Sequence, residues 1–382
     1  MVLQRTVFLV LLFVYSAGFL LISLRQLGDV AVGGGKYAQG EWLIDFSAGY
    51  VRRGFSGEVF MGLSEALGIG VIPLLAMVQW GLTLLCLVGL LGLALRYKMN
   101  VRLSLLLLSP ALVLFWYNNQ YAPFRKELLA YLAFLPLFLR ASTVIAPWQV
   151  LVSMVTFLIA VAFHEALAVF LVPMAIVLWV LLPARRAAGW IAAYALGAVA
   201  LTLFSLAHAS VADVSPICER IYALGGHQRL CETDAPIMWV ELDAISVVAG
   251  GLRLNASETV WPFVEGLLMV VIVFGIALFL LKDILLKDGM IASLIVSFAA
   301  VLPLYAMGGD WGRWVSMQMF ATLFVALAFL KAGDRDRELP PLNPGYVVLI
   351  LAFNLGVGIW HLVPVRAPGF VQTVWQALQA AS

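Results

Sequence analysis

The sequence predicts an all-α protein built as a bundle of membrane-spanning helices, and three observations support this fold class. Hydrophobic residues make up 63% of the 382 residues and charged residues only 12%, whereas soluble domains hold roughly 45–50% and about 25%. Apolar runs of about 20 residues recur along the chain, and each is long enough to cross a hydrocarbon core of roughly 30 Å as a helix. These runs are continuous, whereas the strands of a membrane β-barrel would alternate polar and apolar residues.

Length and polarity divide the chain into about eleven predicted spans, which we interpret as one transmembrane domain over residues 1–382. They are 6–24, 71–95, 103–117, 128–141, 147–163, 166–183, 189–207, 261–281, 290–307, 315–330 and 345–363. The first, in "TVFLVLLFVYSAGFLLISL", is longer than the roughly 7–15 apolar residues of a signal peptide, and no small-residue cleavage site follows it. We therefore expect a retained anchor.

The distribution of basic residues predicts how the chain is oriented. The short connections "RYKMNVR", "PARR" and "KAGDRDR" are dense in Lys and Arg, and short basic loops stay on the cytoplasmic side of a membrane. Because each of these connections follows an even number of spans, the N-terminus is predicted to be cytoplasmic. An odd number of spans then places the C-terminal segment "RAPGFVQTVWQALQAAS" outside.

Two cysteines bear independently on this orientation. Cys218 and Cys231 share the long polar segment 209–260, which the topology places outside, whereas Cys86 lies within an apolar span. A disulfide between Cys218 and Cys231 would contribute about 3 kcal/mol in the chain-entropy model, and it requires an oxidising compartment. The sequence leaves open a disulfide or two free thiols in this external loop.

Several functional motifs are missing from the sequence. It contains no glycine-rich Walker loop, no GxGxxG fingerprint and no His or Cys set with the spacing of metal ligands. These absences argue against a cytosolic enzyme that uses ATP or a nucleotide sugar, and we expect no cofactor, no metal and no nucleic-acid partner. The two long extramembrane segments, 25–70 and 209–260, are both predicted to be external, and the inner loops are too short to build an active site.

The external loop 25–70 holds an unusually polar stretch, "DFSAGYVRRGFSGE". Its candidate site residues are Asp45, Tyr50, Arg52, Arg53 and Glu58. The stretch that follows, "GEVFMGLSEALGIGVIP", repeats apolar residues at helical spacing, which predicts an amphipathic helix at the membrane interface. Alternatively, these residues simply begin the second span early.

Three further polar clusters lie at span ends, and the topology puts all of them on the outer side. They comprise Arg125, Lys126 and Glu127 in "FRKE", His164 and Glu165 in "AFHEAL", and Asp310 and Arg313 in "GGDWGRW". Ionisable groups at membrane depth cost roughly 2.5–3.5 kcal/mol each on insertion scales, so they usually face a cavity or one another. Simpler interpretations are contacts with lipid headgroups, a satisfied interior pair, or an ion pair within a tight turn.

Taken together, the four clusters predict a site for a phosphorylated lipid. Basic residues on the outer side work against the orientation rule, but they are the residues that hold a phosphate or pyrophosphate through paired donors. Asp45 or Glu58 would take the proton from an acceptor hydroxyl as that hydroxyl attacks a sugar carbon. The other residues of the four clusters are predicted to bind substrate.

On these residues, and above all on Asp45 in "WLIDFSAGY", the chain resembles the GT-C superfamily of integral membrane glycosyltransferases. The resemblance implies a polyprenyl-phosphate or polyprenyl-pyrophosphate sugar as donor, and a glycan, lipid or protein as acceptor. It also implies a site facing the periplasm or exterior of a bacterial inner membrane. Asp45 would be its acidic catalytic residue and would act as the base. The positions that match the family's phosphate-binding residues are Arg52, Arg53, Arg125, Lys126 and Arg313. The chain departs from many members in having one clear acid in this loop and a short C-terminal tail.

Two alternative functions stay open. The chain is also similar to O-antigen and capsule polymerases, which join lipid-linked repeat units with the help of arginines in external loops. A transporter or lipid flippase is the second alternative. Transporters commonly contain internal repeats with broken helices at mid-depth, whereas here the halves show no repeat and the charges gather at one face.

Overall fold

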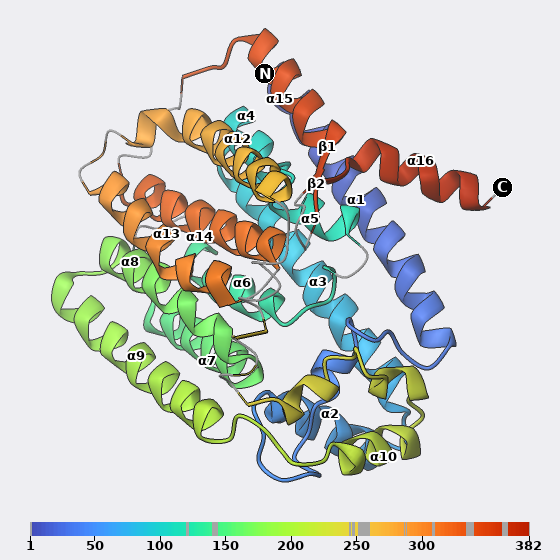
Figure 1. Cartoon of the computed structure of the whole chain (residues 1–382). Coiled ribbons are helices and arrows are strands. Elements are labelled where there is room, and N and C mark those ends of the chain that lie inside the picture. The colour runs from blue at the N-terminus through green and yellow to red at the C-terminus, as the bar shows by residue number, and fades with distance from the viewer. Residues whose placement is uncertain are drawn as a thin grey trace.

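Helices form most of this protein in a computed structural model (Figure 1). The structure describes residues 2–119, 122–139, 144–243, 246, 249–250, 260–285, 287, 289–307, 310–333, 340–360 and 366–381. The α-helices are α1 (Val2–Ala31), α2 (Gly54–Leu67), α3 (Val71–Arg96), α4 (Val101–Leu107), α5 (Val113–Asn118), α6 (Glu127–Phe134), α7 (Pro147–Phe163), α8 (Leu171–Leu181), α9 (Ala184–Ala207), α10 (Ser215–Ala223), α12 (Val260–Leu285), α13 (Met290–Met307), α14 (Trp311–Ala332), α15 (Pro344–Gly356) and α16 (Phe370–Ala381). Short 3-10 turns are η1 (Gly40–Leu43), η2 (Leu135–Phe138), η3 (Glu165–Phe170), η4 (Gln228–Cys231) and η5 (Met238–Glu241). Strands β1 (Val357–Ile359) and β2 (Arg366–Pro368) form a small antiparallel pair with Gly358 opposite Ala367.

Five of these helices are long and apolar enough to cross a membrane, namely α1, α3, α9, α12 and α14. Among the shorter apolar helices, α7 packs against α9, α13 against α14, and α15 against α4. The predicted all-α class is therefore confirmed, and the helices have the composition of a multi-pass membrane protein.

The predicted span 103–117 is wrong as a single helix. The structure divides it into α4 and α5, with residues 108–112 between them. Pro110 lies in this break, where its missing N–H and its ring interrupt the helical hydrogen-bond pattern. The side chain of Asn354 donates a hydrogen bond to the carbonyl of Leu105 at 2.9 Å, so this buried backbone group is still paired.

Helix α14 is the centre of the bundle, whereas α9 lies at its edge. Of the apolar window of each helix, 89% is buried for α14 and 17% for α9. Helix α14 packs against α8, α12 and α13, while α9 exposes Leu196, Leu203 and Leu206. A contiguous apolar surface of this kind is expected where a helix faces lipid.

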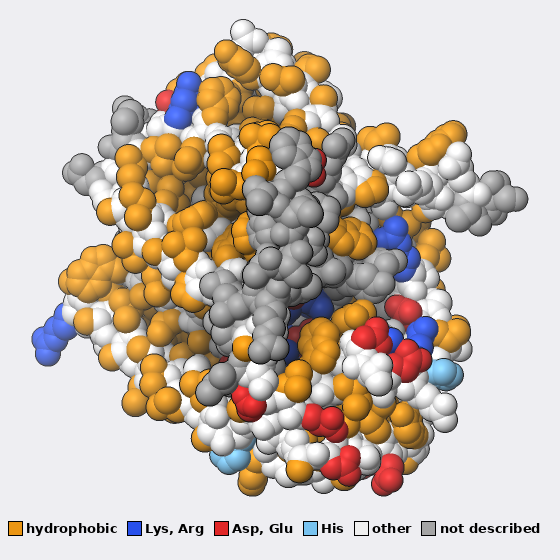
Figure 2. Space-filling view, viewed as in Figure 1, with side chains coloured by type: hydrophobic (Ala, Val, Ile, Leu, Met, Phe, Trp, Pro, Cys, Tyr) orange, Lys and Arg blue, Asp and Glu red, His pale blue; other side chains and the backbone are white. Residues whose placement is uncertain are grey.

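One end of the bundle carries a polar lobe, which we define as residues 32–70 and 208–243. Helices α2 and α10 lie in it, at the bottom of Figure 1. Cys218 and Cys231 are joined by a disulfide, and the backbone N–H of His227 donates to the carbonyl of Gly33 at 2.8 Å. Acidic side chains gather over this lobe, and apolar side chains cover the helices above it (Figure 2).

Helix α2 is separate from the second long helix. It begins after Arg53, ends at Leu67 and is divided from α3 by residues 68–70, so its apolar residues do not begin the second span. Phe60 is buried, whereas Val59 and Leu63 are exposed on its surface. The predicted amphipathic helix is therefore present, although it buries only part of its apolar face.

The opposite end of the bundle is tied together by basic side chains. Arg102 forms an ion pair with Asp283, which joins α4 to α12. The Nζ atom of Lys331 donates to the carbonyl of Leu137 at 2.6 Å, which joins α14 to η2. The basic connection "KAGDRDR" predicted at this end lies largely outside the described residues.

Candidate functional site

Residues from all four predicted clusters meet at the lobe end of α14, around a residue that the sequence did not single out. This residue is Glu41 in η1, which is buried. Its Oε1 atom lies 3.2 Å from Nε2 of His164 and 3.7 Å from Nη1 of Arg53 and Nη2 of Arg313. Its Oε2 atom lies 3.9 Å from Nε of Arg125. We define the Glu41 cluster as Glu41, Arg53, Arg125, Glu127, His164, Glu165, Asp310 and Arg313.

Arg53 links the first loop to the end of α7. It precedes α2 with a φ of 64°, a left-handed conformation that is uncommon outside glycine. From there its Nη2 donates to Oε1 of Glu165 at 3.0 Å, and its Nε also contacts this carboxylate. Several N–H groups of one guanidinium on one carboxylate give a strong and directional pair.

Arg313 lies on the first turn of α14 and is held from both sides. Its Nε donates to Glu127 at the start of α6, and its Nη1 donates to Oδ2 of Asp310 at 3.2 Å. The guanidinium also lies 5.2 Å from the ring centre of Trp314, within the range of a cation–π contact. Arg313 is therefore engaged by short contacts within the protein.

Arg125 is paired much more loosely. Its two carboxylate contacts, to Glu41 and to Oδ2 of Asp310, are both 3.9 Å long, which is beyond hydrogen-bond length. In the part of the chain that the structure describes, Nε of Arg125 and Oε2 of Glu41 are both buried without a hydrogen-bond partner. Oε2 of Glu127, in the same cluster, is in the same state, and a bound water or ligand is a common partner for such groups.

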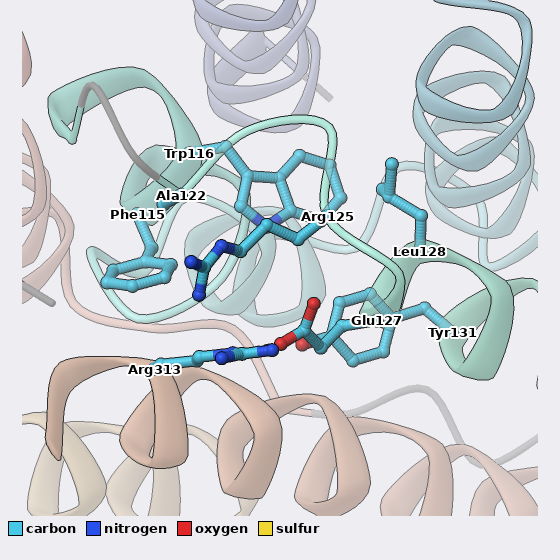
Figure 3. A pocket seen from close by; sticks show the side chains of 8 residues that line it. All are labelled: Phe115, Trp116, Ala122, Arg125, Glu127, Leu128, Tyr131 and Arg313. Atoms are coloured by element: carbon cyan, nitrogen blue, oxygen red, sulfur yellow. The ribbon is translucent and has the colours of Figure 1, made fainter. Parts of the chain in front are cut away.

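A pocket opens beside Arg125, between α5, α6 and the start of α14. Its cavity volume is only about 10 Å³, far below the roughly 300–1,000 Å³ of typical ligand pockets. Its lining residues are Phe115, Trp116, Ala122, Arg125, Glu127, Leu128, Tyr131 and Arg313. Figure 3 shows the guanidinium of Arg125 above that of Arg313, with the carboxylate of Glu127 against Arg313. As it stands, the pocket admits about one water molecule between the two arginines, so a phosphate that binds there must displace side chains.

The charge of Glu41 follows from its neighbours. Burial raises the pKa of this carboxyl, but Arg125, Arg313 and His164 together hold it well below its usual range. His164 has a lowered pKa because it is buried and because Arg53 is close, so its imidazole is neutral at neutral pH. Its Nδ1 accepts from the backbone N–H of Ala166 at 3.3 Å, which leaves Nε2 as the atom that donates to Glu41.

Lys126 lies behind the pocket instead of in it. The residue is buried, and its Nζ donates to the carbonyl of Phe163 at 2.9 Å. Burial lowers the pKa of this ammonium to about 7. Lys126 thus connects the start of α6 to the end of α7, and its amino group is not among the pocket-lining atoms.

Asp45 and Glu58 belong to a second group of charges. Oδ1 of Asp45 accepts from the N–H and the hydroxyl of Ser47, and Oδ2 lies 3.1 Å from Nη1 of Arg220. Arg220 also binds Glu58 at 3.1 Å and Glu65 at 2.9 Å. Burial raises the pKa of Asp45. We define Asp45, Glu58, Glu65 and Arg220 as the Arg220 cluster. Among the described residues, no hydrogen bond or ion pair joins it to the Glu41 cluster.

Tyr50 and Arg52 also face the lobe and not the pocket. The Nη2 atom of Arg52 donates to the carbonyl of Trp239 at 2.7 Å, and burial, with Arg53 beside it, lowers its pKa to about 10. Tyr50 is 63% exposed and packs against Phe204 and His208. The consecutive residues Arg52 and Arg53 therefore contact different parts of the molecule.

Sequence reasoning missed Glu41 and Arg220. Glu41 is a single acid next to the apolar residues "WLI", and a lone carboxylate in such surroundings was the available signal. Arg220 follows Cys218 by two residues, but its partners lie 155–175 positions earlier in the chain, so no local pattern points to them.

Within the described ranges, no three His, Cys, Asp or Glu side chains are grouped as metal ligands. Comparison of the chain with protein-family models, with curated proteins and with solved structures finds no match. The function is therefore argued from the geometry of the site.

Proposed function

We propose that this protein is a membrane glycosyltransferase that moves a sugar from a polyprenyl-phosphate-type lipid donor to an acceptor hydroxyl. The observation that carries the proposal is the loosely paired Arg125, which lines a pocket opposite Arg313 at the end of an apolar helical bundle. Guanidinium groups bind phosphate oxygens through paired, charge-assisted hydrogen bonds. A lipid-linked donor brings its phosphate to this depth with its chain in the membrane.

Arg125 is the best placed arginine for the donor phosphate. Arg313 and Arg53 each give short contacts to a carboxylate, so binding a phosphate there would break an existing pair. If Arg125 binds a phosphate, it loses only its contacts of 3.9 Å with Glu41 and Asp310. Arg313 faces it across the pocket and adds positive potential as the phosphate leaves the sugar, which stabilises the charge that develops.

The geometry favours Glu41 over Asp45 as the carboxylate that activates the acceptor, because Glu41 lies next to Arg125 and Arg313 of the pocket, although it does not line the pocket itself. Both oxygens of Asp45 already accept hydrogen bonds, whereas Oε2 of Glu41 accepts none from the described residues and faces Arg125. In the proposed reaction the acceptor oxygen bonds to the anomeric carbon as the carbon–phosphate oxygen bond breaks. The phosphate leaves with the electron pair, and the hydroxyl proton passes to Glu41. His164 orients that carboxylate.

The proposed location is a bacterial inner membrane, with the lobe facing the periplasm or exterior. The disulfide in the lobe supports this orientation because such bonds persist in oxidising compartments. The basic side chains at the opposite end of the bundle, including Arg102 and Lys331, support a cytoplasmic position for that end. About eleven spans, a cytoplasmic N-terminus, an external C-terminus and an interfacial α2 complete the proposal.

The test measures consumption of synthetic polyprenyl-phosphate sugars by the purified protein in proteoliposomes supplied with a panel of glycan, lipid and peptide acceptors, read as release of polyprenyl phosphate. The wild type is expected to consume at least one sugar of the series. Arg125→Met should lower the affinity for that donor about 10- to 100-fold, since it removes charged hydrogen bonds of about 1.5–3 kcal/mol. Arg229→Met is the matched control, because Arg229 binds Asp29 in the lobe region. Absence of donor consumption by the wild type, or equal losses in both variants, would refute the proposal.

A further inference from the structure

Arg125 is preceded by a residue whose backbone is held by two buried side chains. The carbonyl oxygen of Phe124 accepts a hydrogen bond from Nε1 of Trp42 at 2.8 Å and from Nε2 of Gln79 at 3.0 Å. Trp42 belongs to η1 and Gln79 to α3, and both side chains are buried. Two donors from different elements therefore converge on the peptide group that carries Arg125.

Gln79 also holds the loop that carries Glu41. Its Nε2 donates to the carbonyl of Ala38 at 2.6 Å, and its Oε1 accepts from Gln26 at 2.6 Å and from Gln39 at 3.0 Å. Gln26 and Gln39 are buried as well. One side chain on a long helix thus fixes two segments, one with Glu41 and one with Arg125.

The backbone at Phe124 needs this support. Its φ is 65°, in the left-handed region that a bulky residue adopts at a cost in free energy. Such a conformation persists where the surrounding structure determines it, and here the two hydrogen bonds to its carbonyl do so. The next residue directs its guanidinium to a point 3.9 Å from Glu41.

We propose that Gln79 and Trp42 are positioning residues that set Arg125 opposite Glu41, within reach of a bound phosphate and outside hydrogen-bond distance of the carboxylate. Neither residue lines the pocket, so both act through the backbone of Phe124. The role in binding rests on the proposed function, whereas the link between Gln79 and Arg125 does not require it.

The first experiment needs no ligand. Thermal unfolding in detergent micelles is measured for Gln79→Met, Arg125→Met and the double variant, and the fall in melting temperature of the double variant is compared with the sum of the single falls. Gln149→Met is the control, because Gln149 is also buried and donates to a backbone carbonyl, that of Pro136 at 2.5 Å. We expect Gln79→Met and Arg125→Met to be non-additive and Gln149→Met and Arg125→Met to be additive. Additivity in both pairs would overturn the proposal.

The second experiment measures binding of farnesyl phosphate to the protein in micelles. Trp42→Phe removes the indole donor but keeps a ring against Phe60 and Phe163, and it should weaken binding about three- to tenfold. Gln149→Met should bind like the wild type. If Trp42→Phe also binds like the wild type, the positioning role is refuted while the proposed function stands. If the wild type itself fails to bind, the proposed function fails, and the unfolding cycle alone decides the link between Gln79 and Arg125.

Discussion

Two clusters of arginine and carboxylate begin four residues apart on the same loop, yet their surroundings differ. In the Glu41 cluster the side chains of Glu41, Arg125 and Arg313 are 3%, 9% and 9% exposed. In the Arg220 cluster Asp45 is fully buried, but Arg220, Glu58 and Glu65 are 23%, 44% and 49% exposed. The first cluster is assembled from segments spread over most of the chain, and the second joins α2 to α10.

This difference separates a candidate site from a structural contact. Exposed ion pairs contribute little and are easily formed, typically about 0–1 kcal/mol each. Buried charges cost several kcal/mol in lost hydration, and a buried pair that does not reach hydrogen-bond length recovers only part of that cost. The Glu41 cluster contains such a pair, Arg125 with Glu41. We propose that a bound ligand completes this arrangement.

The largest expected difference between the two clusters is in the transfer rate when one acid of each is neutralised. Glu41→Gln should lower the rate of sugar transfer by about 10²–10⁴-fold, the range for loss of a general base. Asp45→Asn should lower this rate far less, because both carboxylate oxygens of Asp45 already accept hydrogen bonds, from Ser47 and from Arg220. Both are measured as single-turnover rates in proteoliposomes. A loss at Asp45→Asn as large as that at Glu41→Gln would return the catalytic role to Asp45.

Removal of the disulfide tests whether the stability of the lobe and the affinity for the donor are independent. Replacing both Cys218 and Cys231 with serine should destabilise the lobe by about 3 kcal/mol, because the bond ties α10 to η4 next to Arg220. Donor affinity should stay close to that of the wild type, since the Glu41 cluster has no contact with this bond in the described part of the chain. Limited proteolysis of the lobe and donor binding are measured in parallel. A collapse of donor binding with an intact lobe would contradict this separation.

Arg220 provides a smaller test of the same division. Arg220→Met leaves the buried Asp45 without its charged partner, and an unpaired buried acceptor costs about 1–3 kcal/mol. The melting temperature should fall, while the Michaelis constant for the donor should change less than in Arg125→Met. Glu65→Gln is a milder comparison because Glu65 is half-exposed and should change the melting temperature only slightly. A selective rise in the donor Michaelis constant for Arg220→Met would place the Arg220 cluster in the site.

A pH dependence of stability is expected from Lys126, which lies beside the Glu41 cluster. The pKa of Lys126 is lowered from 10.5 to about 7 in the folded protein, so between these values the unfolded chain binds more protons than the folded one. Stability should therefore rise with pH over this window, by at most about 1.4 kcal/mol per pH unit. Melting temperatures at pH 7, 8 and 9 measure this rise, and Lys126→Met should abolish it. An unchanged slope in Lys126→Met would assign the rise to another group.

Helices with clear apolar boundaries were predictable from the sequence. The predicted spans 147–163 and 290–307 coincide with α7 and α13, since Pro147 begins one and Gly289 precedes the other. The interruption of the helix at Pro110 was not predicted, because the residues on both sides continue one apolar run. The four polar clusters were visible as local patterns in the sequence, but the central position of Glu41 among them was not. It depends on contacts with residues up to 272 positions away, which no short segment encodes.

The consecutive residues Arg52 and Arg53 have a mechanical consequence. Arg52 donates to the carbonyl of Trp239 in the lobe, and Arg53 donates to Glu165 at the start of η3. Their Cα atoms are about 3.8 Å apart across one rigid peptide plane. The lobe and the Glu41 cluster are therefore joined through one pair of neighbouring residues, which limits how far Trp239 and Glu165 can move apart.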